Sequence, residues 1–413
     1  MTNLLWPGDQ RAGALMTDRA LLQSMVAVES AWLDALAGAG LVPVAKPDTA
    51  LHHLVDGRDC DMLADAAEDG GNPVIGLVTL LRQRATPTVA PWIHRGLTSQ
   101  DVVDTALMLA LHDVVKHLES QLAEQISVLC ALAVKHRATP MVARTLTQHG
   151  APSTFGAKVA GWLDGVADAY QRLTALDIPA QFGGAVGNCS ATVELAALTG
   201  QADPVTAATH VTRSAATSLG LSYRRPWHTT RGPVTAAANA LVGCSDCWGR
   251  IAADVLTLSR PEIAELSEPS SGARGESSSM PHKRNPVLSV LIRRAAIAGP
   301  PMAATLHTAA ALANDERPDG SWHAEWDTLR TLGRRTVIAG SQCTELLAGL
   351  EVDTANMARN LGATDVLGEQ RAIAALVDQS PSPTYLGAVD QLIDDSVRCA
   401  QRLLDDKARN GRV

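Results

Sequence analysis

A serine-rich segment spanning residues 274–286 contains the groups needed to hold a reactive oxyanion. It reads Arg-Gly-Glu-Ser-Ser-Ser-Met-Pro-His-Lys-Arg-Asn-Pro, and its glycine and prolines predict a loop rather than a core element. A serine alkoxide is a strong base only where donors stabilise its charge, and Lys283, Asn285 and the loop amides are such donors. Although glycine and serine runs are usually linkers, this composition favours a catalytic loop that binds an anion.

Two other polar segments interrupt apolar stretches of the chain. Residues 94–101 read His-Arg-Gly-Leu-Thr-Ser-Gln-Asp, and residues 144–152 read Arg-Thr-Leu-Thr-Gln-His-Gly-Ala-Pro. Both are rich in groups that bind anions, and neither is needed for helix packing. The formal net charge of −8 argues against a nucleic-acid partner, whereas the local basic groups suit a small anionic substrate.

Long helices are expected to position these segments. Apolar residues recur every three or four positions across 103–133, which predicts one long amphipathic helix. Residues 98–101 precede it and supply capping side chains, so this polar segment lies at a helix N-terminus, where free amides attract anions. Similar patterns predict helices over 233–259, from 286 towards 300 and over 326–350, and Pro300 predicts a kink or break in the third.

The composition favours a helical fold. Hydrophobic residues make up 46% of the chain but aromatic residues only 3%, a combination typical of closely packed helices rather than sheets. Several long helices imply a bundle, so we expect an all-α fold. Shorter, proline-interrupted helices at both ends predict three domains: a helical N-terminal domain over 1–97, a long-helix bundle over 98–350 and a small helical C-terminal domain over 351–413.

The seven cysteines do not form a disulfide framework, and Cys244 and Cys247 are predicted to be a buried, unreactive pair rather than half a metal site. We expect neither a metal nor another cofactor. No run of about 18 apolar residues occurs, which predicts no transmembrane helix. The first residues lack the basic and apolar regions of a secretory signal, so we expect a cytoplasmic location.

Residues 277–285, Ser-Ser-Ser-Met-Pro-His-Lys-Arg-Asn, match the S-S-x-M-P-x-K-x-N signature loop of the fumarase/aspartase superfamily. Residues 96–101 and 145–156 look like two further superfamily segments, and the resemblance extends over nearly the whole chain. It implies a three-domain helical fold and a serine base on a mobile loop. It also implies a homotetramer whose active sites combine segments from different subunits.

Within the superfamily, the chain most resembles the branch of bacterial 3-carboxy-cis,cis-muconate cycloisomerases. The segments that carry this resemblance are residues 5–9, 71–75, 98–101, 181–187, 316–317 and 322–326. Adenylosuccinate lyases usually have His-Asp-Val where this chain has Asn72, Pro73 and Val74. The resemblance therefore implies a tricarboxylate substrate, interconverted with 4-carboxymuconolactone during protocatechuate breakdown. The alternative is a superfamily lyase that eliminates fumarate or a related product from adenylosuccinate or another substituted succinate.

The resemblance also assigns roles to individual residues. Ser277 would donate and remove a proton, Lys283 would stabilise the developing charge, and His149 would complete the catalytic set. The expected substrate-binding residues are His94, Thr98, Ser99, Arg144, Thr147, Gln148, Ser278, Asn285 and Arg317. Alternatives stay open: Ser278 as the base, helix capping for Thr98 and Ser99, bundle salt bridges for Arg144 and Arg317, and a structural role for His149.

Two residues depart from the superfamily pattern. Glu276 stands where glycine is usual, and Val290 stands where many members have a glutamate paired with the histidine that matches His149. A carboxylate leaving group, with a pKa of roughly 4, needs little help from an acid. The missing glutamate therefore fits a cycloisomerase, in which Ser277 protonates carbon and His149 mainly binds and orients the substrate.

Overall fold

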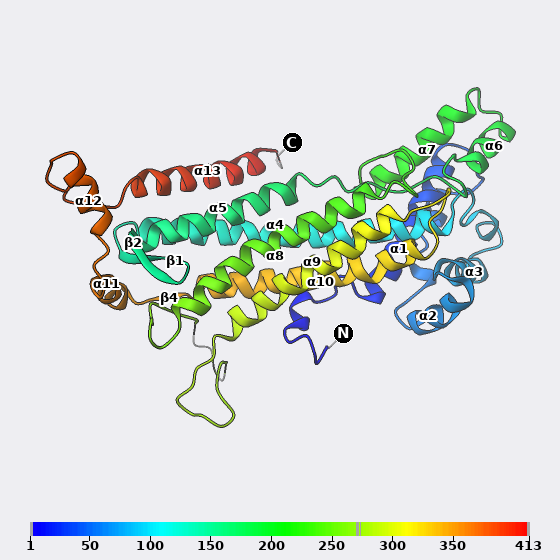
Figure 1. Ribbon diagram of the computed structural model, residues 1–413. Coiled ribbons are helices and arrows are strands. Elements are labelled where there is room, and N and C mark those ends of the chain that lie inside the picture. Colours follow the sequence, from blue (N-terminus) through cyan, green and yellow to red (C-terminus); the bar gives the residue numbers. More distant parts are fainter. Residues whose placement is uncertain (1–2, 270–271, 273, 411–413) are drawn as a thin grey trace. The chain divides into compact units, whose positions relative to one another are not determined.

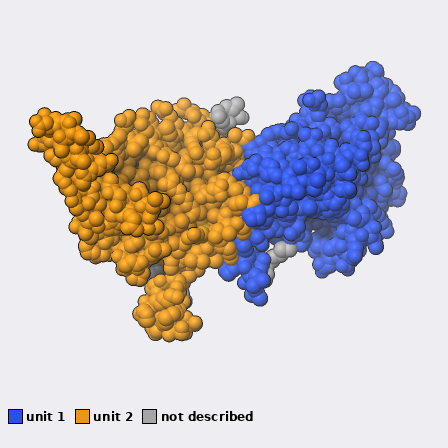
Figure 2. Space-filling view, in the orientation of Figure 1, with its two compact units in different colours: residues 1–116, 176–239, 301–335 blue, residues 117–175, 240–300, 336–413 orange. Residues whose placement is uncertain are grey.

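The computed structural model describes residues 3–269, 272 and 274–410. Its contacts divide the chain into two compact units, each assembled from three segments (Figure 2). Unit 1 comprises residues 1–116, 176–239 and 301–335, and unit 2 comprises residues 117–175, 240–300 and 336–413. The three-domain division expected from the sequence stays a prediction.

Four long helices contribute residues to both units (Figure 1): α4 (Ser99–Lys135), α8 (Gly232–Leu258), α9 (Val287–Ala311) and α10 (Gly320–Ala348). In unit 1, Trp322 Nε1 of α10 donates to Asp104 Oδ1 of α4 at 2.9 Å. In unit 2, Gln125 of α4 donates to Gly340 O of α10 at 3.1 Å and accepts from Trp248 Nε1 of α8 at 2.7 Å. Buried polar side chains thus join long helices within each unit, and the predicted all-α bundle is confirmed.

Helix α4 shows why these segments are helical. Leu118, Leu122, Ile126 and Leu129 recur at helical spacing and are completely buried. Removing each such side chain from water stabilises the fold by about 1.5–3 kcal/mol. The helix begins at Ser99, four residues before the predicted start at 103, so Asp101 lies inside its first turn. Thr98 N–H donates to Asp101 Oδ2 at 3.0 Å, which satisfies an amide at the helix start.

Helix α9 excludes one of the two outcomes expected at Pro300, the break; a kink there stays a prediction. It continues through Pro300 and Pro301 to Ala311, so the helix does not break at Pro300. Each proline removes one backbone donor, and the helical hydrogen bonds on either side preserve the helix. By length and composition α9 could also cross a membrane, although a core helix passes the same test; 33% of its most apolar window is buried.

Shorter elements complete the two units. In unit 1 these are α1 (Asp18–Gly38), α2 (Asp59–Gly70), α3 (Val74–Arg84), α6 (Ser190–Leu198), α7 (Pro204–Ser218) and the 3₁₀ helices η1 (Asp9–Ala12), η2 (Lys46–Thr49), η3 (His52–Leu54) and η4 (Ala90–Trp92). In unit 2 they are α5 (Phe155–Thr174), α11 (Thr354–Gly362), α12 (Gly368–Leu376), α13 (Val389–Asn410) and the antiparallel pairs β1 (Pro140–Thr145) with β2 (Gln148–Thr154) and β3 (Leu266–Ser267) with β4 (Glu351–Val352). Helix α1 packs against α7, and α5 packs against α13.

Candidate functional site

The serine-rich segment forms a loop that is closed at its base. Asn285 N–H and Asn285 Nδ2 both donate to Gly275 O, at 2.8 and 3.1 Å. Gly275 has a φ of +81°, and a Cβ at this position would lie 2.6 Å from Asn285 O, so only glycine allows the two backbones to approach this closely. Residues 276–284 therefore project as one loop away from the helices of unit 2 (Figure 1).

Within this loop, the described contacts of the Ser277 hydroxyl are with backbone amides, one of the three kinds of donor expected around an oxyanion. Its Oγ accepts the backbone N–H groups of Met280 at 3.1 Å and, more weakly, of Ser279 at 3.4 Å. Amide donors aimed at this oxygen would stabilise negative charge on it. Ser278 and Lys283 lie on the same loop with exposed side chains. The local geometry thus distinguishes Ser277 from Ser278.

Two carboxylates, Glu276 and Glu268, also shape this loop. Glu276 pairs across the loop with Arg284 at 3.8 Å, so the unusual acidic residue has a basic partner. Glu268 accepts the N–H groups of Leu288 and Ser289 at 2.9 and 2.7 Å and caps the N-terminus of α9. This cap, formed 20 residues away in sequence, fixes the end of the loop and has no local sequence signal.

The second polar segment forms the hairpin of β1 and β2. Leu146 and Thr147 occupy its tip with φ values of +47° and +71°, an uncommon conformation for residues other than glycine and asparagine. Thr147 and Gln148 are exposed there. The adjacent His149 Nδ1 lies 2.9 Å from Thr364 Oγ1, which belongs to the connection between α11 and α12. The described partner of this histidine is therefore a hydroxyl group.

Arg144, on β1, is bound to protein rather than presented to a ligand. Its guanidinium donates to both oxygens of Glu265, at 2.6 and 3.0 Å, and Glu265 is fully buried. Asn360 donates to the same carboxylate at 2.8 Å. The structure thus supports the ion-pair alternative for Arg144, because the bidentate contact with Glu265 already neutralises its charge.

In unit 1, Thr98 and Arg317 come together although 219 residues separate them in sequence. Arg317 Nη2 donates to the Thr98 hydroxyl and, at 3.1 Å, to Ala185 O. Ser99 follows as the first residue of α4. His94 has a different environment: its Nδ1 lies 2.6 Å from Glu29 Oε1, a buried carboxylate. Arg317 therefore contacts neutral oxygens, whereas His94 is paired with an acid.

Ten of the twelve predicted site residues fall into three groups, whereas His94 and Arg144 are paired with Glu29 and Glu265 and belong to none of them. Thr98, Ser99 and Arg317 form one group in unit 1. In unit 2, the loop carries Ser277, Ser278, Lys283 and Asn285, and the hairpin carries Thr147 at its tip and Gln148 and His149 at the start of β2. Each group combines hydroxyl or amide donors with a cation or an imidazole, which suits the binding of carboxylates.

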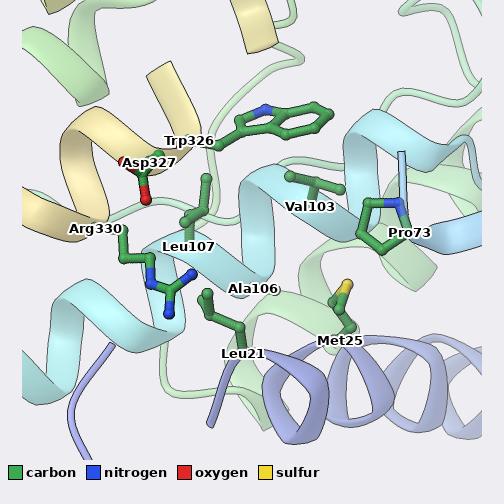
Figure 3. Close-up of a pocket in the computed structure, with 9 residues that line it drawn as sticks. All are labelled: Leu21, Met25, Pro73, Val103, Ala106, Leu107, Trp326, Asp327 and Arg330. Atoms are coloured by element: carbon green, nitrogen blue, oxygen red, sulfur yellow. The ribbon is translucent and has the colours of Figure 1, made fainter. Parts of the chain in front are cut away.

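A separate cavity of about 240 Å³ in unit 1 has a different chemistry (Figure 3). Its walls are mainly apolar and come from α1, α4 and α10, together with Pro73; they include Met25, Val103 and Trp326. Arg330 also lines it, but Arg330 is paired with Asp18 at 2.7 Å. These surroundings do not suit a substrate with several negative charges.

No group of three or more His, Cys, Asp or Glu side chains in the described ranges is arranged to hold a metal ion. Cys244 is buried, and burial raises the pKa of its thiol to about 12. Cys247, which is part-buried, donates its thiol to Cys244 O at 3.1 Å. Both cysteines are free thiols, and the expected burial holds for Cys244 but only in part for Cys247.

Known proteins resemble this chain over most of its length. A family model described as a lyase matches residues 17–298. The nitrosuccinate lyase of Streptomyces davaonensis is 41% identical over 360 residues, which cover 85% of this chain and 74% of that protein. The 3-carboxy-cis,cis-muconate cycloisomerase of Pseudomonas putida is 37% identical over 390 residues, which cover 91% and 89%.

Solved structures agree with the sequence comparisons. The 3-carboxy-cis,cis-muconate lactonizing enzyme from Pseudomonas putida superposes with a TM-score of 0.79 at 34% identity, covering 96% of this chain and 86% of that one. The β-carboxy-cis,cis-muconate cycloisomerase from Acinetobacter calcoaceticus superposes with a TM-score of 0.80 at 26% identity, covering 94% and 97%. Fold and sequence therefore lead to the same group of enzymes.

Proposed function

The chain belongs to the fumarase/aspartase superfamily of lyases, and from this premise we propose that it interconverts 3-carboxy-cis,cis-muconate and 4-carboxymuconolactone. The observation that carries the proposal is the asymmetry of its acid and base groups. Ser277 Oγ receives backbone amides, whereas His149 Nδ1 faces a hydroxyl group rather than a carboxylate. Such a site favours proton transfer at carbon over strong acid assistance to a leaving group.

The proposed reaction uses this asymmetry directly. In lactonisation, a substrate carboxylate oxygen bonds to an alkene carbon, and the electron pair of the double bond moves towards the carbon beside another carboxylate. The Ser277 hydroxyl then gives its proton to that carbon. In the reverse direction, the Ser277 alkoxide removes the proton, the C–O bond breaks and the carboxylate leaves. Since a carboxylate is a weak base, it leaves without a strong acid.

The other residues bind the charges of the substrate in this proposal. Lys283 and Asn285 stabilise the negative charge that develops beside the reacting carbon. Carboxylates are bound by Thr98, Ser99, Thr147, Gln148, Ser278 and Arg317, and His149 orients the substrate through Nε2. Arg317 suits a third carboxylate, because its contacts with Thr98 Oγ1 and Ala185 O leave its positive charge uncompensated by those partners. His94 and Arg144, paired with Glu29 and Glu265, act as supports.

A second candidate reaction is the elimination of nitrite from nitrosuccinate. The 41% identity to a nitrosuccinate lyase favours it. Nitrite, like a carboxylate, is a weak base, so the same one-sided acid–base arrangement serves both reactions. The two substrates differ in charge, because nitrosuccinate carries two carboxylates and carboxymuconate carries three. Arg317 therefore favours the first proposal.

Purified protein incubated with 3-carboxy-cis,cis-muconate should abolish the diene absorbance and form the lactone. Parallel reactions contain nitrosuccinate, with nitrite as the measured product, and adenylosuccinate, with fumarate as the measured product. The proposal is supported if kcat/KM for 3-carboxy-cis,cis-muconate is at least about tenfold higher than kcat/KM for nitrosuccinate and for adenylosuccinate. Release of nitrite or fumarate with an unchanged diene signal would overturn it.

We also propose that the chain forms a homotetramer that completes the active sites with segments from different copies. Ile297 on α9 is 67% exposed and Leu146 at the hairpin tip is 97% exposed, so apolar surface is available for other copies to cover. Sedimentation velocity should then give a mass close to four chains. A monomer at micromolar concentration would contradict this assembly.

A further inference from the structure

Asp101 is a buried carboxylate that joins three distant segments of unit 1. It is completely buried, and it accepts Thr98 N–H at 3.0 Å, Gly183 N–H at 2.8 Å and Gly184 N–H at 2.9 Å. His228 Nε2 lies 2.9 Å from the same carboxylate. A capping residue needs only the first of these contacts. The contacts with Gly183 and Gly184 fix a turn that lies about 80 residues further along the chain, and the contact with His228 reaches a third segment, 127 positions away.

This turn, residues 183–187, presents one of the two oxygens that hold Arg317. Ala185 O accepts from Arg317 Nη2 at 3.1 Å, and the same nitrogen donates to the Thr98 hydroxyl. Asp101 accepts backbone N–H groups from both segments that supply these oxygens, at Thr98 and at Gly184 of the turn. The direction of the Arg317 guanidinium therefore depends on a carboxylate that does not contact it in any described hydrogen bond.

The His228 side chain packs against this turn. Its ring is 4% exposed, and its Cε1 lies 2.7 Å from the position that a Cβ on residue 183 would occupy. His228 Nδ1 is buried without a hydrogen-bond partner among the described residues and lies 3.4 Å from the Cβ position of Gly187. Gly187 has a φ of +79°. The turn thus rests on the imidazole at both ends, which leaves little room for an alternative conformation.

We propose that Asp101, acting with His228, is a positioning residue that sets the geometry of the Thr98 and Arg317 anion subsite and so determines the affinity for the third carboxylate of the substrate. The inference rests on the proposed function for the identity of that substrate. The effect of Asp101 on the turn is independent of the proposed function, because it can be measured without any reaction.

The test compares Asp101→Asn with Asp104→Asn. Asp104 is 1% exposed on the same helix and binds Arg231 at 2.7 and 2.9 Å, but the described hydrogen bonds of the turn do not involve it. Hydrogen exchange of the 181–188 peptide should accelerate about tenfold in Asp101→Asn and stay unchanged in Asp104→Asn. Unchanged exchange in Asp101→Asn would overturn the proposal.

The second readout separates binding from chemistry. In Asp101→Asn, KM for the substrate that the wild type turns over should rise about tenfold, with kcat within about threefold. The dissociation constant of tricarballylate, an inert tricarboxylate, should rise similarly in calorimetry. Faster exchange with unchanged KM and unchanged tricarballylate affinity would show that the turn does not serve the site. Gly187→Ala retains the carboxylate and should reproduce the KM effect, which keeps the test decisive if Asp101→Asn folds poorly.

Discussion

At the scale of single residues, most of the described arginines near the candidate site are bound to acids. Arg144 is paired with Glu265 and Arg231 with Asp104 and Glu325, whereas Arg317 contacts a hydroxyl and a carbonyl oxygen. A guanidinium whose charge is neutralised gains little from a further anion. This difference selects Arg317 from several arginines that look equivalent in the sequence.

Ser277 and Ser278 also differ in their contacts, because the Ser277 hydroxyl accepts two backbone amides and the Ser278 side chain is exposed. We predict that Ser277→Ala lowers kcat by about 10²–10⁴, because the group that moves the proton is lost. Ser278→Ala, the matched control on the neighbouring residue, should retain kcat within about threefold and raise KM instead. Steady-state kinetics at saturating substrate measure both values. A larger loss of kcat in Ser278→Ala would transfer the catalytic role to Ser278.

At the scale of elements, the loop before α9 depends on its base as much as on its serines. Gly275 and Asn285 close that base, and Glu268 fixes the first amides of the following helix. In the turn of residues 183–187, a buried carboxylate, Asp101, binds the backbone of the turn itself. A carboxylate thus caps the helix that follows the loop in the first case and binds the turn directly in the second.

Gly275→Ala tests this dependence. The added Cβ would lie 2.6 Å from Asn285 O, so the base of the loop must open and the amides around Ser277 must shift. We predict a fall in kcat of at least about tenfold with little change in the thermal midpoint. Gly272→Ala is the control, because Gly272 also has a positive φ, +52°, but open space around its Cβ position. Equal losses in the two variants would show that backbone strain, not loop closure, is responsible.

At the scale of the whole molecule, buried ion pairs join segments from opposite ends of the chain. Arg334 on α10 donates to both carboxylate oxygens of Asp9 at 2.8 Å, a contact between residues 325 positions apart. The hydrogen bond from Arg334 lowers the pKa of Asp9 below its ordinary value of 3.8. Unit 1 is thereby stabilised while Asp9 is ionised.

The direction of this shift predicts how stability changes with pH. A lowered pKa gives stability that is complete above the unfolded value and is lost as the pH falls through the folded value. The difference in thermal midpoint between wild type and Asp9→Asn should therefore be largest near about pH 6 and shrink towards about pH 3. Asp18→Asn removes the more exposed pair with Arg330 and should show a smaller difference throughout. A constant gap for Asp9→Asn would contradict the prediction.

Much of the helical scaffold was predictable from the sequence. The apolar spacing of α4 and α8 placed these helices within a few residues, since a periodic pattern reports the buried face of one continuous element. The signature loop also identified the superfamily. The break considered at Pro300 was wrong, because the helical bonds around Pro300 and Pro301 outweigh the donors that the two prolines remove.

The hydrogen-bond and ion-pair partners of individual side chains were not predictable from the sequence in this way. The sequence alone determined which residue types lie at helix starts and on loops, because those properties are local. Only the tertiary structure decided that Arg144 binds Glu265, that Arg317 meets Thr98 and that Asp101 holds the turn of residues 183–187. These contacts join residues 121, 219 and 82 positions apart, and such pairings depend on how helices pack rather than on any neighbouring residue.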